Sequence, residues 1–324
     1  MSSTHSDGAA SAPFSEVGRQ PLGRFAPSPT GPLHAGSLLA AVGSYLDARA
    51  HGARWLVRIE DLDSARVIPG CADGMLRTLE SFGFEWDGAV IYQSSRRDAY
   101  RAALAQLAAA GRTFACSCSR KDLGAAGEES QAYPGTCRNG PTKSGPTAQR
   151  FRVSDRRGEY RDLFQGTQSF DLTTCGDVVV ERRDGIASYQ LAVVVDDAFQ
   201  GVTRVIRGAD LIGSTPWQID LQDSLSVSRP IYGHLPLLLE PDGNKLSKSR
   251  RAVAIDPSLS GSGPLDQSAV SRALTSTLTL LSQLPPPDGA HTTVKDVWIW
   301  ALEHWDPQAL AGRTRVPLSA PGDT

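Results

Sequence analysis

The sequence predicts an α/β protein built on a doubly wound parallel sheet, with an insertion inside the sheet domain and a small helical region after it. Three observations support this class. Segments with the apolar spacing of helices alternate with short apolar runs of strand length, a pattern typical of parallel sheets. A span with Cys, Gly and Pro clusters interrupts the alternation over residues 113–188. After residue 250 only helical patterns return.

The first half of the sheet domain is predicted over residues 21–112. Its opening loop, residues 23–32, cannot lie inside a helix, because its three prolines lack a donor and restrict φ. The elements expected next are a helix over 33–50, a strand over 54–59, and helices over 72–82 and 100–110.

The second half of the sheet domain is predicted over residues 189–250 and the C-terminal region over 251–324. The elements expected there are strands over 189–197 and 201–207, a helical connection over 209–224, and helices over 268–283 and 294–305. Residues 1–20 are rich in Ser, Ala and Gly and lack a secretory pattern, so we expect a disordered tail.

Composition narrows the class of protein. Hydrophobic residues make up 40% of the chain and charged residues 21%, as in ordinary soluble proteins. The net charge of −2 gives no global attraction for nucleic acid, so an RNA partner would have to meet local arginine clusters. No apolar run reaches the ~18–20 residues of a membrane helix, and we expect no membrane partner. Five cysteines in a chain without a signal peptide indicate a reducing cytoplasm.

The segment Pro32-Leu33-His34-Ala35-Gly36-Ser37 leads into the first predicted helix. The first turn of a helix offers free N–H groups and a positive dipole end, which attract anions. His34 can donate a hydrogen bond to a phosphate, and Gly36 leaves room for a flat base against the backbone. The alternative is that His34 is simply a polar residue at a helix start.

A second segment, residues 245–249, contains Lys245 and Lys248 after a turn. The chain has 33 Lys and Arg residues, of which only five are Lys, and two of those five lie in this pentapeptide. Ammonium groups on flexible side chains act as point charges on phosphate. A solvated basic run is the alternative, since Arg250 and Arg251 follow.

Charged side chains fall where strands are predicted to begin or end. Arg24 precedes the proline-rich loop, Glu60 closes a strand, Tyr189 opens one and Arg207 closes another. Ligands of open α/β sheets bind beyond the carboxyl ends of the strands, so these side chains are expected to converge. Two arginines and one carboxylate match a ligand with two carboxylates and one ammonium, such as free glutamate. Strand-end surface charges are the alternative.

Three of the five cysteines, Cys116, Cys118 and Cys137, lie in the predicted insertion. With one more ligand they would complete a closed tetrahedral zinc site. No His is nearby, so Tyr133 is one candidate for the fourth ligand, and Glu128 and Glu129 are others. Unligated buried cysteines are the alternative, because the spacing departs from paired C-x-x-C motifs.

Six segments together resemble the glutamyl-tRNA synthetases, a family of class I aminoacyl-tRNA synthetases. They are RFAPSPTG (24–31), HAGS (34–37), RIEDLD (58–63), YQLAVVVDD (189–197), VIRGADL (205–211) and KLSKS (245–249). The resemblance implies a Rossmann-type catalytic domain with a zinc-binding insertion. It also implies an enzyme that activates L-glutamate with ATP, with Mg²⁺ arriving with the nucleotide.

The resemblance implies roles for particular residues. Glutamate would be bound by Arg24, Phe25, Ala26, Pro27, Ser28, Glu60, Tyr189 and Arg207. ATP would be bound by His34, Gly36 and Lys248, and the charge on its phosphates would be stabilised by His34, Lys245 and Lys248. One structural zinc would be held by Cys116, Cys118, Tyr133 and Cys137.

The chain departs from that family in length. A glutamyl-tRNA synthetase continues into a large helical anticodon-binding region, whereas only residues 251–324 follow the last motif here. The insertion and Gly208-Ala209-Asp210 resemble shortened members of the family. Those members attach glutamate to queuosine in the anticodon loop of tRNA(Asp), and a cytoplasmic monomer is expected.

Three alternatives remain open. The chain is a glutamyl-tRNA synthetase that lost its anticodon domain and still charges a tRNA 3′ end, a non-catalytic regulator that binds RNA or an amino acid, or a small-molecule adenylate-forming ligase. Intact His34, Lys245 and Lys248 argue against the regulator. The Cys-rich insertion, with Glu60 and Arg207, argues against the small-molecule ligase.

Overall fold

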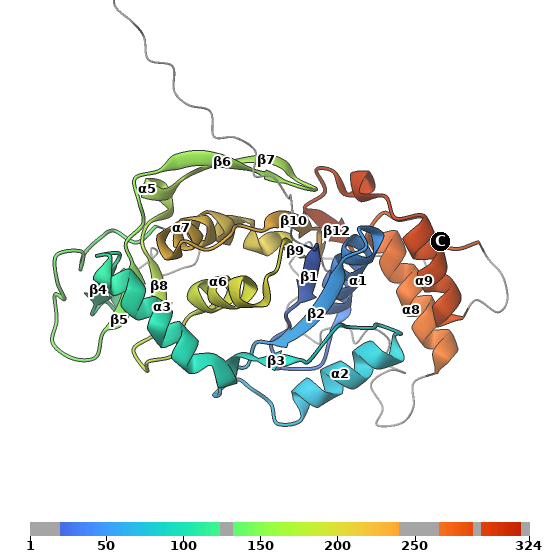
Figure 1. Ribbon diagram of the computed structural model, residues 1–324, viewed down its shortest axis with the longest axis horizontal. Coiled ribbons are helices and arrows are strands. Elements are labelled where there is room, and N and C mark those ends of the chain that lie inside the picture. The colour runs from blue at the N-terminus through green and yellow to red at the C-terminus, as the bar shows by residue number, and fades with distance from the viewer. Residues whose placement is uncertain (1–19, 124–131, 240–265, 288–292, 319–324) are drawn as a thin grey trace, which may run out of the picture.

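A computed structural model describes residues 20–123, 132–239, 266–287 and 293–318 (Figure 1). Within these ranges the chain forms an α/β fold with parallel strands, as the alternation of helical and strand patterns predicts. The segment with Lys245 and Lys248 lies outside the described residues, as does almost all of the predicted tail. Among the described helices, none is both long and apolar enough to cross a membrane.

The first sheet is parallel and has the order β1-β2-β3. Its strands are β1 (Leu22–Phe25), β2 (Arg54–Ile59) and β3 (Ile91–Tyr92). Helix α1 (Ala35–Ala50) connects β1 to β2, and α2 (Cys71–Ser81) lies between β2 and β3 in the chain. The predicted strand over 54–59 and the helices over 33–50 and 72–82 are thus confirmed.

The second sheet has the order β7-β6-β10-β9. Its strands are β6 (Arg157–Asp162), β7 (Gly166–Asp171), β9 (Arg204–Gly208) and β10 (Ile231–Leu235). Strand β10 is parallel to both β6 and β9. The N–H of Thr203, just before β9, donates to the Leu22 carbonyl of β1 at 3.0 Å, so the two sheets meet at these strands. Their carboxyl ends therefore share one edge, where the site lies.

A separate antiparallel sheet lies in the predicted insertion. Its strands are β4 (Thr113–Cys116), β5 (Ala148–Phe151) and β8 (Val178–Glu181). Two one-turn helices, α4 (Arg120–Leu123) and α5 (Leu172–Cys175), belong to the same span. The span is not a self-contained unit, because β6 and β7 also fall within it and join the sheet of β9 and β10. The domain boundaries stay a prediction.

Four further helical elements cover the two halves. They are α3 (Arg97–Ala109), α6 (Tyr189–Gln200), the short η3 (Ala209–Ser214) and α7 (Thr215–Leu225). One prediction is wrong here: residues 189–197 form helix α6 and not a strand. A continuous apolar run fits a buried helix as well as a strand. The left-handed Gly201 that ends α6 is the local signal for a helix. Tyr189 therefore opens a helix.

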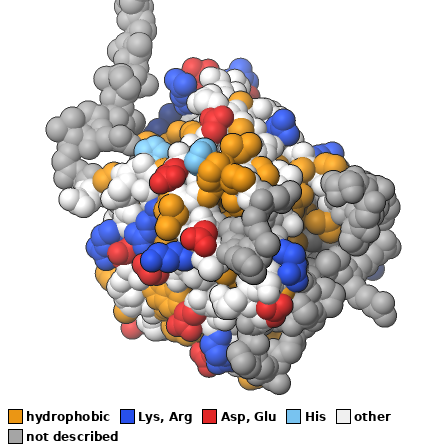
Figure 2. Space-filling view, turned by 90° about the vertical axis from the view of Figure 1, so that its right-hand side faces the viewer, with side chains coloured by type: hydrophobic (Ala, Val, Ile, Leu, Met, Phe, Trp, Pro, Cys, Tyr) orange, Lys and Arg blue, Asp and Glu red, His pale blue; other side chains and the backbone are white. Residues whose placement is uncertain are grey.

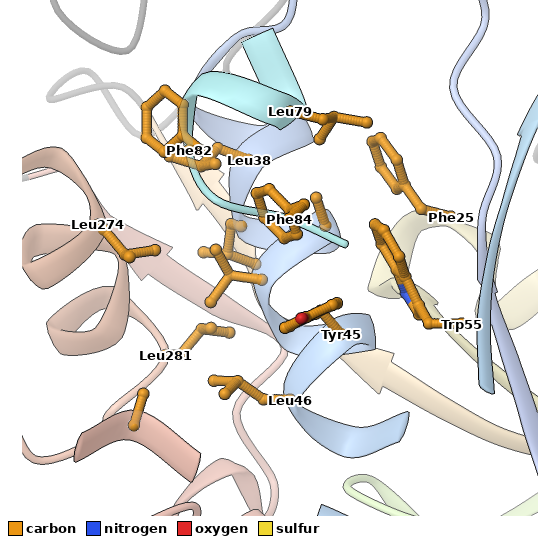
Figure 3. Close-up of a cluster of buried hydrophobic side chains, with 14 of the residues drawn as sticks. Phe25, Leu38, Tyr45, Leu46, Trp55, Leu79, Phe82, Phe84, Leu274 and Leu281 are labelled. Atoms are coloured by element: carbon orange, nitrogen blue, oxygen red, sulfur yellow. The ribbon is translucent and has the colours of Figure 1, made fainter. Parts of the chain in front are cut away.

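The larger core surrounds α1 and includes the C-terminal helices (Figure 3). Tyr45 of α1 makes edge-to-face contacts with Trp55 and Phe84, with ring centroids 5.1 and 5.3 Å apart. Helices α8 (Gln267–Leu280) and α9 (Val294–Glu303) supply Leu274 and Trp298 to this core, which confirms both predicted C-terminal helices. Figure 2 views their outer face, which mixes apolar and charged side chains; Leu284 and Ile299 are exposed.

After α9 the chain returns to β11, which follows the second sheet. The short helix η5 (Pro307–Leu310) leads to β12 (Arg315–Pro317), which pairs in parallel with β11 (Leu237–Leu239). The side chain of Gln165 and the carbonyl of Phe164, in the β6–β7 turn, also bond the backbone of Arg313 and Gly312. The C-terminal segment is thus tied to β11 and to the β6–β7 turn of the second sheet.

Candidate active site

A cavity of about 490 Å³ opens at the shared edge of the two sheets. Residues from the proline-rich loop, the start of α1, the end of β9 and β11 line it. These include Ala26, Pro27, Ser28, His34, Gly36, Gly208 and Leu237. The sequence prediction that the loop and the helix start form one ligand site is consistent with this arrangement.

His34 is the N-cap residue of α1. Its Nδ1 accepts a hydrogen bond from the Ser37 N–H at 3.2 Å, so the ring satisfies one of the free donors of the first turn. A Cβ at position 36 would lie 3.1 Å from His34 Cε1, so Gly36 lets the imidazole fold over the helix start. The helix-start role weighed for His34 is therefore real, and the ring still borders the cavity.

Glu60 follows β2 and is joined to the loop opposite, because its N–H donates to the Pro27 carbonyl at 2.9 Å. Its side chain is 12% exposed, and Arg58 Nη2 lies 3.9 Å from Oε1. Burial raises the pKa of Glu60 to about 7, despite the opposing charges of Arg58 and Arg24. A cation bound beside this carboxyl would therefore favour its ionised form.

Arg24 points to the same place but is held by the protein. Its Nε donates to Asp197 Oδ1 and its Nη1 to the Ile206 carbonyl, both at 3.3 Å. Asp197 also accepts from Arg58 Nη1 at 2.8 Å. Burial opposes ionisation of Asp197, but these two arginines hold its pKa below the usual value. Asp197 thus accepts from two arginines at once, and Arg58 also lies within 4.0 Å of Glu60 and Asp196.

Arg207 lies at the end of β9 and is 5% exposed. Its Nη1 donates to the Tyr189 hydroxyl at 3.2 Å and to Gln218 Oε1 at 2.7 Å. Burial raises the pKa of Tyr189, whose hydroxyl also feels the charges of Arg207, Glu60 and Arg24. The predicted site residues therefore lie close enough to influence one another's charges, even though Tyr189 was expected on a strand. They are Arg24, Glu60, Tyr189 and Arg207.

Sequence reasoning gave no role to several residues that shape this site. Arg58 and Asp197 lie within quoted motifs, but their pairing across the sheet has no local signal. His234 and Asp162 lie in no motif, and only the fold brings them to Arg207. Phe25 and Ala26 border the cavity beside Pro27 and Ser28, and their role in binding glutamate stays a prediction.

A second cluster lies in the insertion, at the end of β4. The Sγ atoms of Cys116, Cys118 and Cys137 are all within 4.8 Å of one another, and all five cysteines of the chain are free thiols. The Tyr133 hydroxyl lies 3.4 Å from Cys116 Sγ and 3.9 Å from Cys118 Sγ. The predicted juxtaposition of three thiols and a phenol is confirmed.

The spacing of these atoms fits a tetrahedral zinc ion. Zn–S bonds of about 2.3 Å and a Zn–O bond of about 2.0 Å require S···S near ~3.8 Å and S···O near ~3.5 Å. The Cys118 and Cys137 sulfurs are 3.6 Å apart, and the two S···O distances above fall around the second value. The Tyr133 oxygen also accepts the Cys137 N–H at 2.7 Å, which fixes the hydroxyl beside the three sulfurs.

The pKa values of these thiols are also consistent with a cation site. Burial opposes ionisation of Cys137, but hydrogen bonds from the backbone at Ser117 and Thr142 lower its pKa to about 5. Burial and the neighbouring Cys137 raise the pKa of Cys118 to about 11. Ionisation of one thiol thus opposes ionisation of its neighbour, and a bound cation would remove that opposition.

The fold and the site are those of a class I aminoacyl-tRNA synthetase catalytic domain. The family model of the tRNA synthetases class I (E and Q), catalytic domain, matches residues 22–273. A glutamate tRNA ligase from Elizabethkingia meningosepticum, solved in complex with its amino acid, shares the fold with a TM-score of 0.75. At 24% identity that match covers 93% of this chain and 68% of the ligase.

Relatives of similar length narrow the family further. The chain is 50% identical over 289 residues to the glutamyl-Q tRNA(Asp) synthetase of Aromatoleum aromaticum, covering 88% of each chain. It is 48% identical over 301 residues to the protein of the same name from Pseudomonas aeruginosa strain PAO1, covering 92% of this chain and 96% of that one. The chain belongs to the class I tRNA synthetases (E and Q) and, within them, to the glutamyl-Q tRNA(Asp) synthetases, and is a ligase.

Proposed function

We propose that this enzyme activates L-glutamate with ATP and transfers the glutamyl group to queuosine in the anticodon loop of tRNA(Asp). The observation that carries the amino-acid part is the convergence of Arg24, Arg207 and Glu60 at one sheet edge. Two cations and one carboxyl are complementary to the two carboxylates and one ammonium of glutamate. The names of the relatives support the tRNA part.

The chemistry requires no protein nucleophile. An oxygen of the glutamate α-carboxylate attacks the α-phosphorus of ATP, and pyrophosphate leaves with the electrons of the broken P–O bond. A hydroxyl of the queuosine ring then attacks the glutamyl carbonyl, loses its proton and releases AMP. The protein supplies orientation and charge stabilisation.

The nucleotide is assigned to the cavity at the start of α1. His34 and Gly36 border that cavity and would meet the phosphates and the base. Lys245 and Lys248 lie outside the described residues, but β11, which lines the cavity, ends at Leu239 just before their segment. Mg²⁺ bound with ATP would offset charge on the phosphates.

Zinc in the insertion is assigned to Cys116, Cys118, Cys137 and Tyr133. Three thiolates and a phenolate around Zn²⁺ leave a net negative charge. Arg150 offsets it, because its Nε donates to Cys116 Sγ at 3.4 Å and its guanidinium lies 3.9 Å from the centre of the Tyr133 ring. The ion would supply a structural crosslink between β4 and the loop before β5.

Replacing Cys118 by Ser is expected to abolish stoichiometric zinc binding. A closed site couples metal affinity to local folding, so the antiparallel sheet of the insertion should loosen while the parallel sheets persist. Elemental analysis and amide hydrogen exchange would measure both effects. Cys175→Ser is the matched control, because Cys175 is not in the cluster. Purified wild-type protein without zinc would contradict the assignment.

The KM for glutamate is expected to rise as the pH falls below about 7. Glu60 has a pKa raised to about 7, mainly by burial, and its protonated form cannot accept the glutamate ammonium. The loss should approach about tenfold per pH unit below that pKa. The check is the pH profile of glutamate-dependent ATP–pyrophosphate exchange. Glu60→Gln should bind weakly with a flat profile; a flat wild-type profile would contradict the role.

Glutamate transfer to full-length tRNAs tests the whole proposal. Queuosine-containing tRNA(Asp) should accept radiolabelled glutamate, and the same tRNA without queuosine should not. Charging of the 3′ end of tRNA(Glu), with no transfer to tRNA(Asp), would instead establish a shortened glutamyl-tRNA synthetase. Glutamate-dependent pyrophosphate exchange without any transfer would support the activation step alone.

A further inference from the structure

A buried chain of hydrogen bonds runs from β6 through β10 to the guanidinium of Arg207. Arg207 Nε donates to His234 Nε2 at 3.1 Å, and His234 Nδ1 lies 2.5 Å from Asp162 Oδ2. His234 and Asp162 are 0% and 1% exposed. Both side chains are fully buried, and His234 reaches the site only through Arg207, so we place neither residue in contact with a substrate.

These hydrogen bonds determine which nitrogen of His234 carries the proton. Arginine Nε is only a donor, so His234 Nε2 must accept and therefore lacks a proton. The proton of the neutral ring is then on Nδ1, where it is donated to Asp162. Asp162 is itself fixed, because its Oδ1 accepts the N–H groups of Phe164, Gln165 and His234 at 3.0, 2.9 and 3.1 Å.

The remaining partners of Arg207 are also uncharged. Besides His234 they are the side chains of Tyr189, Gln218 and Thr215 and the carbonyl of Leu211. Among the described residues, no carboxylate lies within 4.0 Å of this guanidinium. Arg24 and Arg58 differ in this respect, since both pair with Asp197. Arg207 is thus held by neutral acceptors that orient its charge without cancelling it.

Tyr189 extends the influence of the Arg207 charge toward the proposed glutamate site through its hydrogen bond with the guanidinium. Its oxygen accepts from Arg207 Nη1, so its own O–H proton is polarised and remains to be donated. A carboxylate that binds there is stabilised by the hydroxyl and by the guanidinium behind it. If the guanidinium tilted, both contributions would fall.

We propose that His234 and Asp162 are positioning residues, which hold Arg207 for recognition of one carboxylate of the amino-acid substrate. The inference rests on the proposed glutamate site. His234 orients the guanidinium through Nε2, and Asp162 holds His234 in the tautomer that makes this bond. A carboxylate in place of His234 would neutralise Arg207, whereas the neutral ring does not.

Two variants test the two links of the chain. His234→Phe keeps a ring but removes the acceptor of Arg207 Nε. Asp162→Asn keeps the volume, but its amide would donate to His234 Nδ1 and drive the proton to Nε2, where it would face the Arg207 donor. Both should raise the KM for glutamate about 10- to 100-fold in pyrophosphate exchange and leave the KM for ATP within about twofold.

Rescue and packing controls separate positioning from folding. His234→Gln offers one acceptor and one donor and should recover part of the affinity for glutamate. Tyr232→Phe is the packing control. The ring that stacks beside His234, with centroids 6.3 Å apart, and lies 5.1 Å from the Arg207 guanidinium is kept, and the hydrogen bond with Gln222 is lost. It should lower thermal stability more than it changes the KM for glutamate.

Calorimetric titration with glutamate, without ATP, makes the outcomes distinguishable. Wild-type binding that is lost in His234→Phe and Asp162→Asn supports the proposal. Wild-type binding that both variants retain overturns it and leaves the proposed function intact. No wild-type binding or glutamate-dependent exchange overturns the glutamate site and this inference together. As an independent readout, nitrogen NMR of wild-type His234 should show the proton on Nδ1; a proton on Nε2 overturns the inference.

Discussion

Replacing Arg207 by Met is expected to lower kcat/KM for glutamate by about 10²–10³-fold, because a buried charge that faces a carboxylate would be lost. Met preserves much of the apolar stem, while the neutral partners Gln218 and Thr215 would be left without their donor. Affinity for ATP should change little, because Arg207 does not line the cavity at the start of α1. Glutamate-dependent pyrophosphate exchange and separate ATP titrations measure the two effects.

Arg207→Lys is the matched control for this prediction. It keeps the charge but not the planar fork, so it cannot satisfy His234, Gln218 and Thr215 at once. It should recover only part of the lost activity. Wild-type glutamate kinetics in Arg207→Met would show that the substrate carboxylates are held elsewhere, with Arg24 the remaining candidate.

A short RNA stem-loop that carries queuosine is expected to accept glutamate, whereas an acceptor-stem minihelix is not. The first motif begins at Arg24 and the last ends at Ser249, and the chain matches relatives named for tRNA(Asp) over 88–98% of their length. In the proposed reaction the anticodon loop itself enters the active site, so the anticodon arm alone should suffice as substrate. The difference should be all or none, because in the proposed reaction the attacking oxygen belongs to queuosine.

Transfer of radiolabelled glutamate to the two RNAs makes that measurement. The same stem-loop with guanosine in place of queuosine is the control. Binding of both stem-loops should weaken with added salt, because arginine–phosphate contacts release counterions. Glutamylation of the minihelix alone would restore the alternative of a shortened synthetase that charges a 3′ end.

Much of the fold could be predicted because its signals are local. The proline-rich loop, the strand over 54–59 and the C-terminal helices follow from spacing, breakers and burial periodicity. Residues 189–197 could not be assigned in this way. Their apolar run is buried on helix α6 and has no clear period, so strand and helix fit it equally well. Gly201, the glycine that ends the helix, was a better indicator of helix than the apolar run.

The candidate site was predictable only where its residues lie in motifs. Glu60 and Arg207 stand at predicted strand ends and Arg24 just before the proline-rich loop, and the rule for open sheets brings such residues together. Pairings between residues far apart in the sequence have no comparable signal in a motif. Asp197 and Arg58 are 139 positions apart, and His234 and Asp162 are 72 apart. These contacts depend on the order of the strands, which spacing along the chain does not encode.

The pairing of β11 with β12 limits how far this enzyme can be trimmed. Strand β11 lines the cavity assigned to ATP, and its edge is covered by residues that come after the last helix. A chain cut at Glu303 would keep every motif yet leave the backbone of β11 open, as a template for pairing with another molecule. The same cut would remove Leu310, which is fully buried in the larger core, so truncations placed there would disturb that core together with the cavity assigned to ATP.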